Sequence, residues 1–123
     1  MRALIVDDSR AVRAMIGRIV RELGFSVVEA GNGAEALARL AESGTADVAL
    51  VDWNMPEMNG VEFVVAARAV PAYASMRIVM VTSESEMGRV ASALDAGANE
   101  YLMKPFDAEA LREKLALVGV GAA

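Results

Sequence analysis

Three short stretches of the chain are apolar at every position, and they restrict the fold more than any other feature of the sequence. They span residues 3–6, 48–51 and 78–81, and valine and isoleucine are frequent in them. Unbroken apolar runs of this length are typical of strands buried on both faces, as in a parallel sheet covered by helices. The chain is therefore expected to form a parallel sheet with helices on both sides.

Two further stretches, residues 25–29 and 100–103, mix apolar and polar side chains and are expected to form the edge strands. Helical patterns separate the strands: a clear apolar stripe covers residues 12–23, and shorter stripes cover 34–41, 61–70, 90–96 and 111–118. This alternation predicts an α/β protein with a doubly wound (βα)5 fold of the flavodoxin-like type. With strands two and five at the edges, the expected sheet order is 2-1-3-4-5.

The expected helix ends carry residues that start or stop helices. A capping residue precedes each helix, and glycine or proline follows the first four. The candidate N-caps are Ser9, Asn32, Asn59 and Asp107, with Ser83 and Glu86 as a capping box, and the stops are Gly24, Gly44, Pro71 and Gly97. With 123 residues, the chain is expected to form one domain over residues 1–118, followed by a short tail over 119–123.

Composition and charge exclude several classes of function. The chain has no histidine and no cysteine, which excludes Ser-His-Asp and Cys-His catalysis and zinc sites built from those residues. A net charge of −5 argues against a nucleic-acid partner. No apolar stretch approaches the roughly 20 residues that span a membrane, and the first strand starts too early to follow a signal peptide. A cytoplasmic protein without membrane contact is expected.

Polar side chains end the predicted strands at one edge of the sheet. Asp7 and Asp8 follow the first strand, Asp52 the third, Thr82 the fourth and Lys104 the fifth. In an open parallel sheet, sites form beyond the carboxyl ends of the strands, where the strand order reverses. That point lies between the first and third strands, so the three aspartates are expected to share one pocket.

Three crowded carboxylates repel one another unless a cation binds between them, and Mg²⁺ prefers oxygen ligands. Together with the Lys104 ammonium and the Thr82 hydroxyl, this set suits a phosphoryl group, and Asp52 could act as its nucleophile. Each of these residues alone has a simpler explanation as an ordinary turn or cap residue. Their joint placement at neighbouring strand ends favours a functional site.

Four motifs give the chain a specific resemblance to a known family: VDDSR at 6–10, VDWNMPEMNG at 51–60, VTSES at 81–85 and YLMKPF at 101–106. Together they resemble the receiver domain of two-component response regulators and, within it, the CheY-like chemotaxis regulators. The resemblance covers nearly the whole chain. The sequence departs from the chemotaxis pattern at residues 87–89, which leaves the downstream target open.

The resemblance implies a role for each matched residue. Asp52 corresponds to the phosphoacceptor, and Thr82 and Lys104 to the residues that contact the phosphoryl group. The resemblance further implies a site for Mg²⁺, or alternatively Mn²⁺, held by Asp7, Asp8, Asp52 and the backbone carbonyl of Asn54. It also implies that Thr82 and Tyr101 form a switch and that Asn54 and Glu84 influence the phosphoryl lifetime. Finally, it implies that the Lys104–Pro105 peptide is cis.

The implied function is that of a stand-alone response regulator, a phosphoprotein that catalyses its own phosphorylation by a sensor histidine kinase and its own dephosphorylation. Phosphorylation would change how the fourth helix, fifth strand and fifth helix bind a downstream protein target, either the flagellar motor switch or another effector. A phosphatase is a further expected partner. The alternatives are an intermediate carrier in a phosphorelay, an aspartate-nucleophile phosphatase, and a flavodoxin-like cofactor-binding domain.

Overall fold

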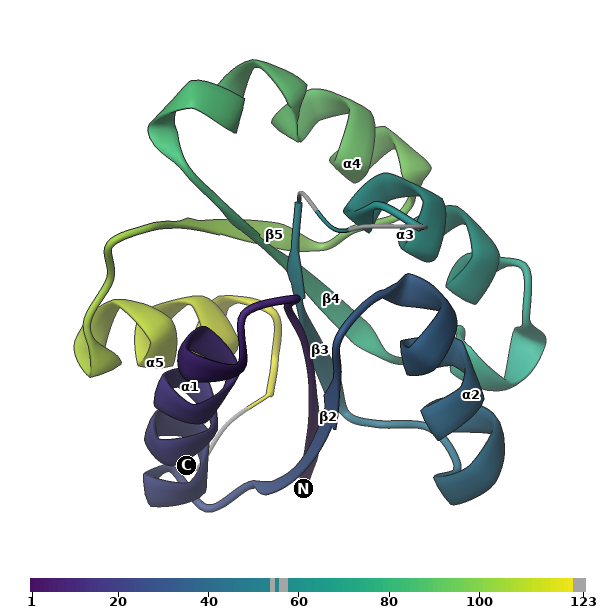
Figure 1. The fold of residues 1–123 in the computed structure, drawn as a ribbon, viewed down its shortest axis with the longest axis horizontal. Coiled ribbons are helices and arrows are strands. Elements are labelled where there is room, and N and C mark those ends of the chain that lie inside the picture. The colour runs from purple at the N-terminus through teal and green to yellow at the C-terminus, as the bar shows by residue number, and fades with distance from the viewer. Residues whose placement is uncertain (54, 56–57, 121–123) are drawn as a thin grey trace.

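Five parallel strands form one sheet in the order β2-β1-β3-β4-β5, which confirms the predicted fold class (Figure 1). The computed structural model describes residues 1–53, 55 and 58–120. None of the helices in these ranges is both long enough and apolar enough to cross a bilayer. The strands are β1 (Arg2–Val6), β2 (Ser26–Ala30), β3 (Val48–Asp52), β4 (Arg77–Thr82) and β5 (Glu100–Met103).

The α-helices alternate with the strands, and four of them begin at the predicted caps. At each of these caps a side-chain oxygen accepts a hydrogen bond from the backbone N–H three residues later, which satisfies a donor that the helix leaves free. Of the expected tail, Val120 donates its N–H to the Leu115 carbonyl at 3.0 Å, and residues 121–123 lie outside the described ranges. The helices are α1 (Arg10–Glu22), α2 (Gly33–Ser43), α3 (Gly60–Arg68), α4 (Val90–Ala96) and α5 (Ala108–Leu117).

The segment between β4 and α4 is a 3₁₀ helix, η2 (Glu84–Arg89), which the sequence patterns do not predict. The Glu86 carboxylate accepts hydrogen bonds from the backbone N–H and the hydroxyl of Ser83, at 3.2 and 2.8 Å. Regular α-helix begins only at Val90. Gly88 lies within the intervening turn, and its low helix propensity favours the irregular entry.

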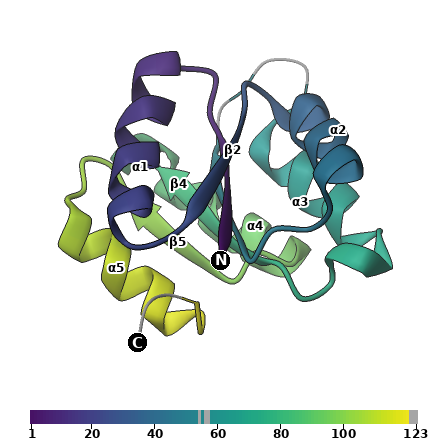
Figure 2. The same cartoon turned by 90° about the horizontal axis from the view of Figure 1, so that it is seen from below.

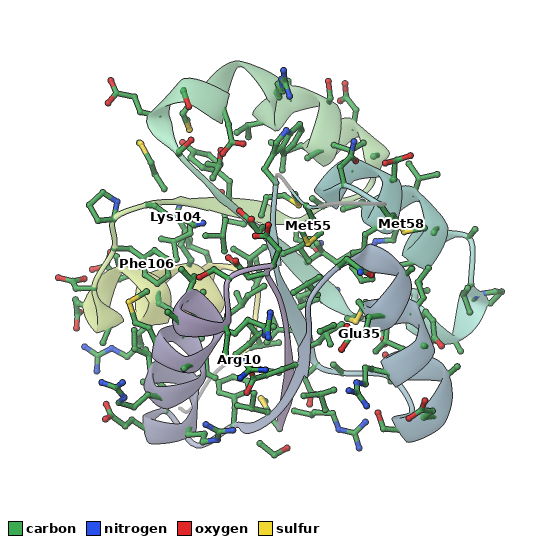
Figure 3. All side chains as sticks on the ribbon, viewed as in Figure 1. Arg10, Glu35, Met55, Met58, Lys104 and Phe106 are labelled. Carbon is green, nitrogen blue, oxygen red and sulfur yellow. The ribbon has the colours of Figure 1, made fainter. Side chains whose placement is uncertain are left out.

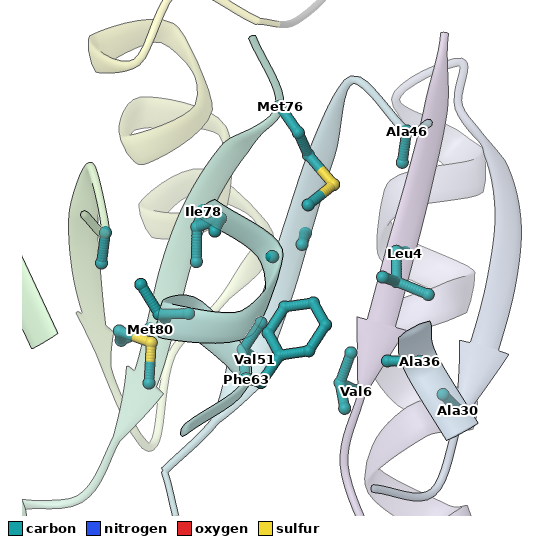
Figure 4. Packing of buried hydrophobic residues seen from close by; sticks show 14 of the residues in the cluster. Leu4, Val6, Ala30, Ala36, Ala46, Val51, Phe63, Met76, Ile78 and Met80 are labelled. Atoms are coloured by element: carbon teal, nitrogen blue, oxygen red, sulfur yellow. The ribbon is translucent and has the colours of Figure 1, made fainter. Parts of the chain in front are cut away.

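Helices cover both faces of the sheet: α1 and α5 lie on one side, and α2, α3 and α4 lie on the other (Figure 2). Successive side chains of a strand point to opposite faces, so each central strand contributes to both cores. Ile5 belongs to the cluster with Ile16 of α1 and Leu111 of α5. Its neighbour Val6 belongs to the opposite cluster with Phe63 of α3, which is fully buried (Figure 4). This two-sided burial holds the strand tips in fixed positions.

Three arginines close the amino-terminal edge of the sheet by donating to backbone carbonyls. Arg68 donates to the carbonyls of Gly97 and Tyr73 at 2.9 and 3.0 Å and joins the ends of α3 and α4. Arg2 donates to the carbonyls of Ser43, the last residue of α2, and of Gly44, and Arg77 donates to the Val118 carbonyl after α5. These contacts supply donors to carbonyl groups at helix ends, and the Tyr73 carbonyl also accepts from the Met76 N–H.

Candidate functional site

The carboxyl ends of β1 and β3 bring three aspartates together. Val6 pairs with Val51 in the sheet, so the next residues, Asp7 and Asp52, lie side by side at the carboxyl ends of neighbouring strands. Each of Asp7, Asp8 and Asp52 offers a carboxylate oxygen, and these oxygens lie within 4.8 Å of one another. Asp7 and Asp52 are only 2% and 7% exposed, whereas Asp8 is exposed. The predicted crowding of carboxylates at this edge is therefore present.

Lys104 reaches this cluster from the loop that follows β5 (Figure 3). Its Nζ lies 3.2 Å from Asp52 Oδ1 and 3.6 Å from Asp7 Oδ2. Its backbone N–H donates to the Thr82 carbonyl at 2.7 Å, which ties the loop to the end of β4. The peptide bond between Lys104 and Pro105 is cis. The ammonium therefore lies between the two buried carboxylates.

The pocket holds more negative than positive charge. The pKa of Asp52 is raised to about 6, because burial raises it most, the negative charge of Asp7 raises it further, and Lys104 lowers it only in part. Burial lowers the pKa of Lys104, but the Asp52 and Asp7 carboxylates outweigh that effect and raise it above its ordinary value. A single ammonium thus leaves the carboxylates undercompensated, and the pocket favours either a proton or an additional cation.

Asp7 shows most directly that the pocket fits a cation. Its Oδ1 accepts a hydrogen bond from the Ser9 N–H at 2.9 Å. Its Oδ2 is buried and accepts no hydrogen bond from any residue in the described part of the chain. A buried acceptor without a donor costs about 1–3 kcal/mol, so its presence beside two further carboxylates suits a hard divalent ion with oxygen ligands.

Thr82 ends β4 beside this pocket. It is completely buried, and its hydroxyl donates to the Ser83 carbonyl at 3.3 Å rather than to a carboxylate. Since Asp52 pairs with Val81, Thr82 is the next residue along the neighbouring strand. Glu84 lies exposed at the start of η2, and Asn54, the predicted carbonyl ligand, lies outside the described residues.

Tyr101 lies on β5, half-buried and packed against the core that includes α3 and α4. The Nζ of Lys114 on α5 lies 4.7 Å from the centre of its ring, close enough for a cation–π interaction. The same Nζ lies 3.4 Å from the Glu100 carboxylate. Through these two contacts, Lys114 joins α5 to β5.

Gly60 supports the site in a way that the sequence patterns do not predict. A Cβ atom at this position would lie 2.7 Å from the Asp52 carbonyl oxygen and 2.7 Å from Met80 Cε. The Gly60 N–H donates to the Trp53 carbonyl at 3.0 Å. Only glycine allows α3 to begin this close to the end of β3. The sequence signal was the predicted N-cap Asn59, which indicated a helix start but no such contact.

Arg13 is a second supporting residue that the sequence patterns do not predict. Its Nη1 donates to the Asp7 carbonyl at 2.5 Å, and its Nε donates to Glu29 Oε1 at 3.2 Å. Helical side chains lean toward the amino terminus of their helix, so an arginine one turn after the Ser9 cap can reach back to the end of β1. That position within the first helix was the available signal.

Comparison with known proteins assigns the family. The family model described as "Response regulator receiver domain" matches residues 3–116. The chain belongs to this family. The assignment confirms the resemblance carried by the four motifs and favours a receiver domain over a flavodoxin-like cofactor-binding domain.

Named relatives place this receiver domain with the CheY type. It is 45% identical over 116 residues to a chemotaxis protein CheY homolog of Campylobacter jejuni, covering 94% of this chain and 89% of that protein. It is 41% identical over 119 residues to chemotaxis protein CheY1 of Helicobacter pylori, covering 96% of each. Among solved structures, chemotaxis protein CheY4 of Vibrio cholerae matches with a TM-score of 0.88 at 37% identity, covering 95% of this chain and 97% of that chain.

Proposed function

We propose that this receiver domain accepts a phosphoryl group on Asp52 from the phosphohistidine of a sensor histidine kinase. The observation that carries the proposal is a buried carboxylate at the tip of a central strand, with Lys104 Nζ 3.2 Å from its Oδ1. Rigid placement of a nucleophile beside a cation is what phosphoryl transfer requires of a protein. The names of the relatives further support chemotaxis-type signalling.

In the proposed step, an Asp52 carboxylate oxygen attacks phosphorus in line with the bond to the donor. The phosphorus–nitrogen bond of the phosphohistidine breaks, its electron pair returns to the imidazole, and an acyl phosphate forms on Asp52. The attacking carboxylate must be ionised, and a pKa of about 6 leaves it largely ionised at neutral pH. Lys104 then donates hydrogen bonds to the phosphoryl oxygens, where negative charge accumulates.

Asp7, Asp8 and Asp52 would hold the Mg²⁺, or alternatively Mn²⁺, and Asn54 is the further ligand predicted from the sequence. Such an ion supplies charge stabilisation to phosphoryl oxygens when it is bound. The buried Asp7 Oδ2, without a donor among the described residues, supports this assignment. The mutual distance of at most 4.8 Å between the three carboxylate oxygens supports it as well.

We propose that Thr82 and Tyr101 transmit the change to the surface formed by α4, β5 and α5. The Thr82 hydroxyl would leave the Ser83 carbonyl for a phosphoryl oxygen, and the half-buried Tyr101 ring would move inward. Such a shift selects between two existing conformations rather than creating a new one. The altered surface would change its affinity for a downstream protein, either the flagellar motor switch or another effector. Asn54 and Glu84 are proposed to influence how long the phosphoryl group survives.

The test is incubation with MgCl₂ and acetyl phosphate, followed by intact-mass measurement. We expect one added phosphoryl group on the unmodified chain and none on Asp52→Asn. A matched control is Asp47→Asn, which alters an exposed carboxylate at the opposite edge of the sheet and should be labelled normally. Equal labelling of the unmodified chain and Asp52→Asn, or no labelling of either, would contradict the proposal.

An intermediate carrier in a phosphorelay would use the same site, so only the recipient distinguishes it. Co-precipitation with phosphorylated and unphosphorylated protein would identify that recipient. An effector that binds only the phosphorylated form supports the signalling role. A histidine-containing recipient that gains the phosphoryl group from Asp52 supports the phosphorelay instead.

A further inference from the structure

Arg13 is anchored directly behind the aspartate pair, and the proposed phosphoryl chemistry does not use it. Its side chain is 16% exposed and is ion-paired with Glu29 of β2. Moving an arginine out of water is unfavourable unless its donors are satisfied. Both of its described hydrogen bonds, to the Asp7 carbonyl and to Glu29, lie on the β1 and β2 side of the pocket.

The polar atoms of Asp7 show what this contact achieves. Its N–H donates to the Ala30 carbonyl at 3.1 Å, its Oδ1 accepts from the Ser9 N–H, and its carbonyl accepts from Arg13. Only Oδ2 is left without a hydrogen-bond donor in the described part of the chain, and it lies 3.6 Å from Lys104 Nζ. Local contacts therefore hold every polar atom of Asp7 except the one that faces the pocket.

The Asp7 carbonyl belongs to the peptide unit that joins Asp7 to Asp8. A peptide unit is planar, so a hydrogen bond that fixes its carbonyl also fixes the direction in which the chain enters Asp8. Asp8 is exposed and is the least restrained of the three carboxylates. Arg13 therefore restrains two candidate ligands through one bond.

Because Glu29 offsets the charge of Arg13, Arg13 affects the pocket by orienting the Asp7–Asp8 peptide and not by its charge. A guanidinium is permanently charged, and an uncompensated positive charge beside the pocket would repel a metal ion. The Glu29 carboxylate, 3.2 Å from Arg13 Nε, offsets that charge. The pair therefore orients the Asp7–Asp8 peptide with little net repulsion of a cation.

We propose that Arg13 is a positioning residue for the divalent-cation site, acting through the Asp7 carbonyl and held in place by Glu29. The proposal rests on the cation-binding part of the proposed function and is independent of phosphoryl transfer to Asp52. Supporting groups around metal ligands typically change metal affinity by about 10–100-fold when they are removed. A purely structural link between α1 and β2 would instead change stability and leave the affinity of the folded protein unaltered.

The experiment is calorimetric titration with MgCl₂ of the unmodified chain, Arg13→Met, Arg13→Lys and Arg18→Met. Arg18 is an exposed arginine of the same helix and serves as the matched control for loss of charge. We expect Arg13→Met to weaken Mg²⁺ binding about 10-fold, Arg13→Lys to weaken it less, and Arg18→Met to change it less than about twofold. Urea unfolding of each variant establishes that the folded protein is being titrated.

A second readout separates positioning from chemistry. At saturating MgCl₂, labelling of Arg13→Met by acetyl phosphate should proceed within about threefold of the unmodified rate, because the variant alters cation affinity and leaves Asp52 and Lys104 in place. If Arg13→Met does not fold, Glu29→Gln tests the same anchor, and we expect it to weaken Mg²⁺ binding about threefold. Unaltered Mg²⁺ affinity in the folded variants would overturn this proposal alone. No Mg²⁺ binding by the unmodified chain would overturn the cation site as well.

Discussion

The amino-terminal edge of the sheet, where the strands begin, and the carboxyl edge, where they end, treat their polar groups differently. At the amino-terminal edge, Arg2, Arg68 and Arg77 donate to backbone carbonyls: Arg2 and Arg77 join the sheet to the ends of α2 and α5, and Arg68 joins α3 to the end of α4. At the carboxyl edge, Asp7 Oδ2 lacks a hydrogen-bond donor among the described residues, and the pKa of Asp52 is raised to about 6. One edge satisfies its polar groups through contacts within the protein, whereas the other holds buried carboxylates whose charge is only partly compensated.

This difference shows where the molecule gives up stability. Departures from full polar satisfaction are expected at functional sites, because groups that are already satisfied cannot bind a ligand strongly. The strand interiors do not explain the contrast, since β3 is buried along its whole length and β1 and β4 are buried at every residue after the first. The contrast lies in the side chains at the ends of the strands and just beyond them, and four measurements can test it.

The largest expected effect concerns the ammonium group of Lys104 at the carboxyl edge. Replacing Lys104 by methionine should slow labelling by acetyl phosphate about 100-fold at saturating MgCl₂, because the phosphoryl oxygens lose a charged donor. The chain has one other lysine, Lys114, which contacts Tyr101 rather than the carboxylates, and Lys114→Met is the matched control. A rate for Lys104→Met within threefold of the unmodified rate would show that Lys104 is not part of the reacting site.

At the amino-terminal edge, Arg68→Met should lower the free energy of unfolding by about 3 kcal/mol, because several carbonyls lose a charged donor at once. Arg89 is exposed, and Arg89→Met should change the free energy of unfolding by less than about 0.5 kcal/mol. Urea denaturation measures both. Labelling of the folded Arg68→Met protein should be normal, and a strong loss of labelling would mean that the two edges are coupled.

Removing the Asp52 charge at the carboxyl edge should raise the free energy of unfolding, whereas Arg68→Met should lower it. Without divalent cations at pH 7, Asp52→Asn should raise the free energy of unfolding by about 2 kcal/mol, since it removes a buried carboxylate that repels Asp7. Asp47 provides the comparison at the other edge, where its Oδ2 accepts the Arg2 N–H at 2.7 Å. Asp47→Asn should not stabilise the protein, and equal stabilisation by both variants would remove the distinction between the edges.

The smallest effect is a dependence on pH. The pKa of Asp52 is raised from 3.8 to about 6 in the folded state, so between these values the folded protein binds more protons than the unfolded chain. The free energy of unfolding therefore falls as the pH rises through this range. In the absence of divalent cations, it should be about 1 kcal/mol higher at pH 5 than at pH 7. The difference between the unmodified chain and Asp52→Asn isolates this contribution. A difference that stays constant from pH 7 to pH 5 would contradict the raised pKa.

Most of the fold was predictable because the central strands are apolar at every position and polar residues mark their ends. Besides η2, an exception is β2, predicted at residues 25–29 and found at Ser26–Ala30. Phe25 is apolar and buried, but its N–H donates to the Val20 carbonyl at 3.0 Å, so it belongs to the end of α1. Hydrophobicity alone cannot distinguish a buried turn residue from the first residue of a strand.

The carboxylate cluster was predictable for a related reason: parallel strands must bring their carboxyl ends to one edge. The roles of Arg13 and Gly60 were not predictable in the same way. The first depends on where a long side chain ends, and the second on how closely α3 approaches the Asp52 carbonyl at the end of β3. Both are contacts between elements, which local sequence patterns do not specify.

The reactive side chains described here come from strand ends and the loops that follow them, and this has a consequence for how such a protein can diversify. Helix exteriors, where Leu94 and Leu117 are 40% and 70% exposed, contribute nothing to the carboxylate pocket. Under the proposed function, mutations there would change which partner the protein binds and would leave the phosphoryl chemistry unaltered. After gene duplication, two copies would then bind different partners while both keep the same carboxylate pocket.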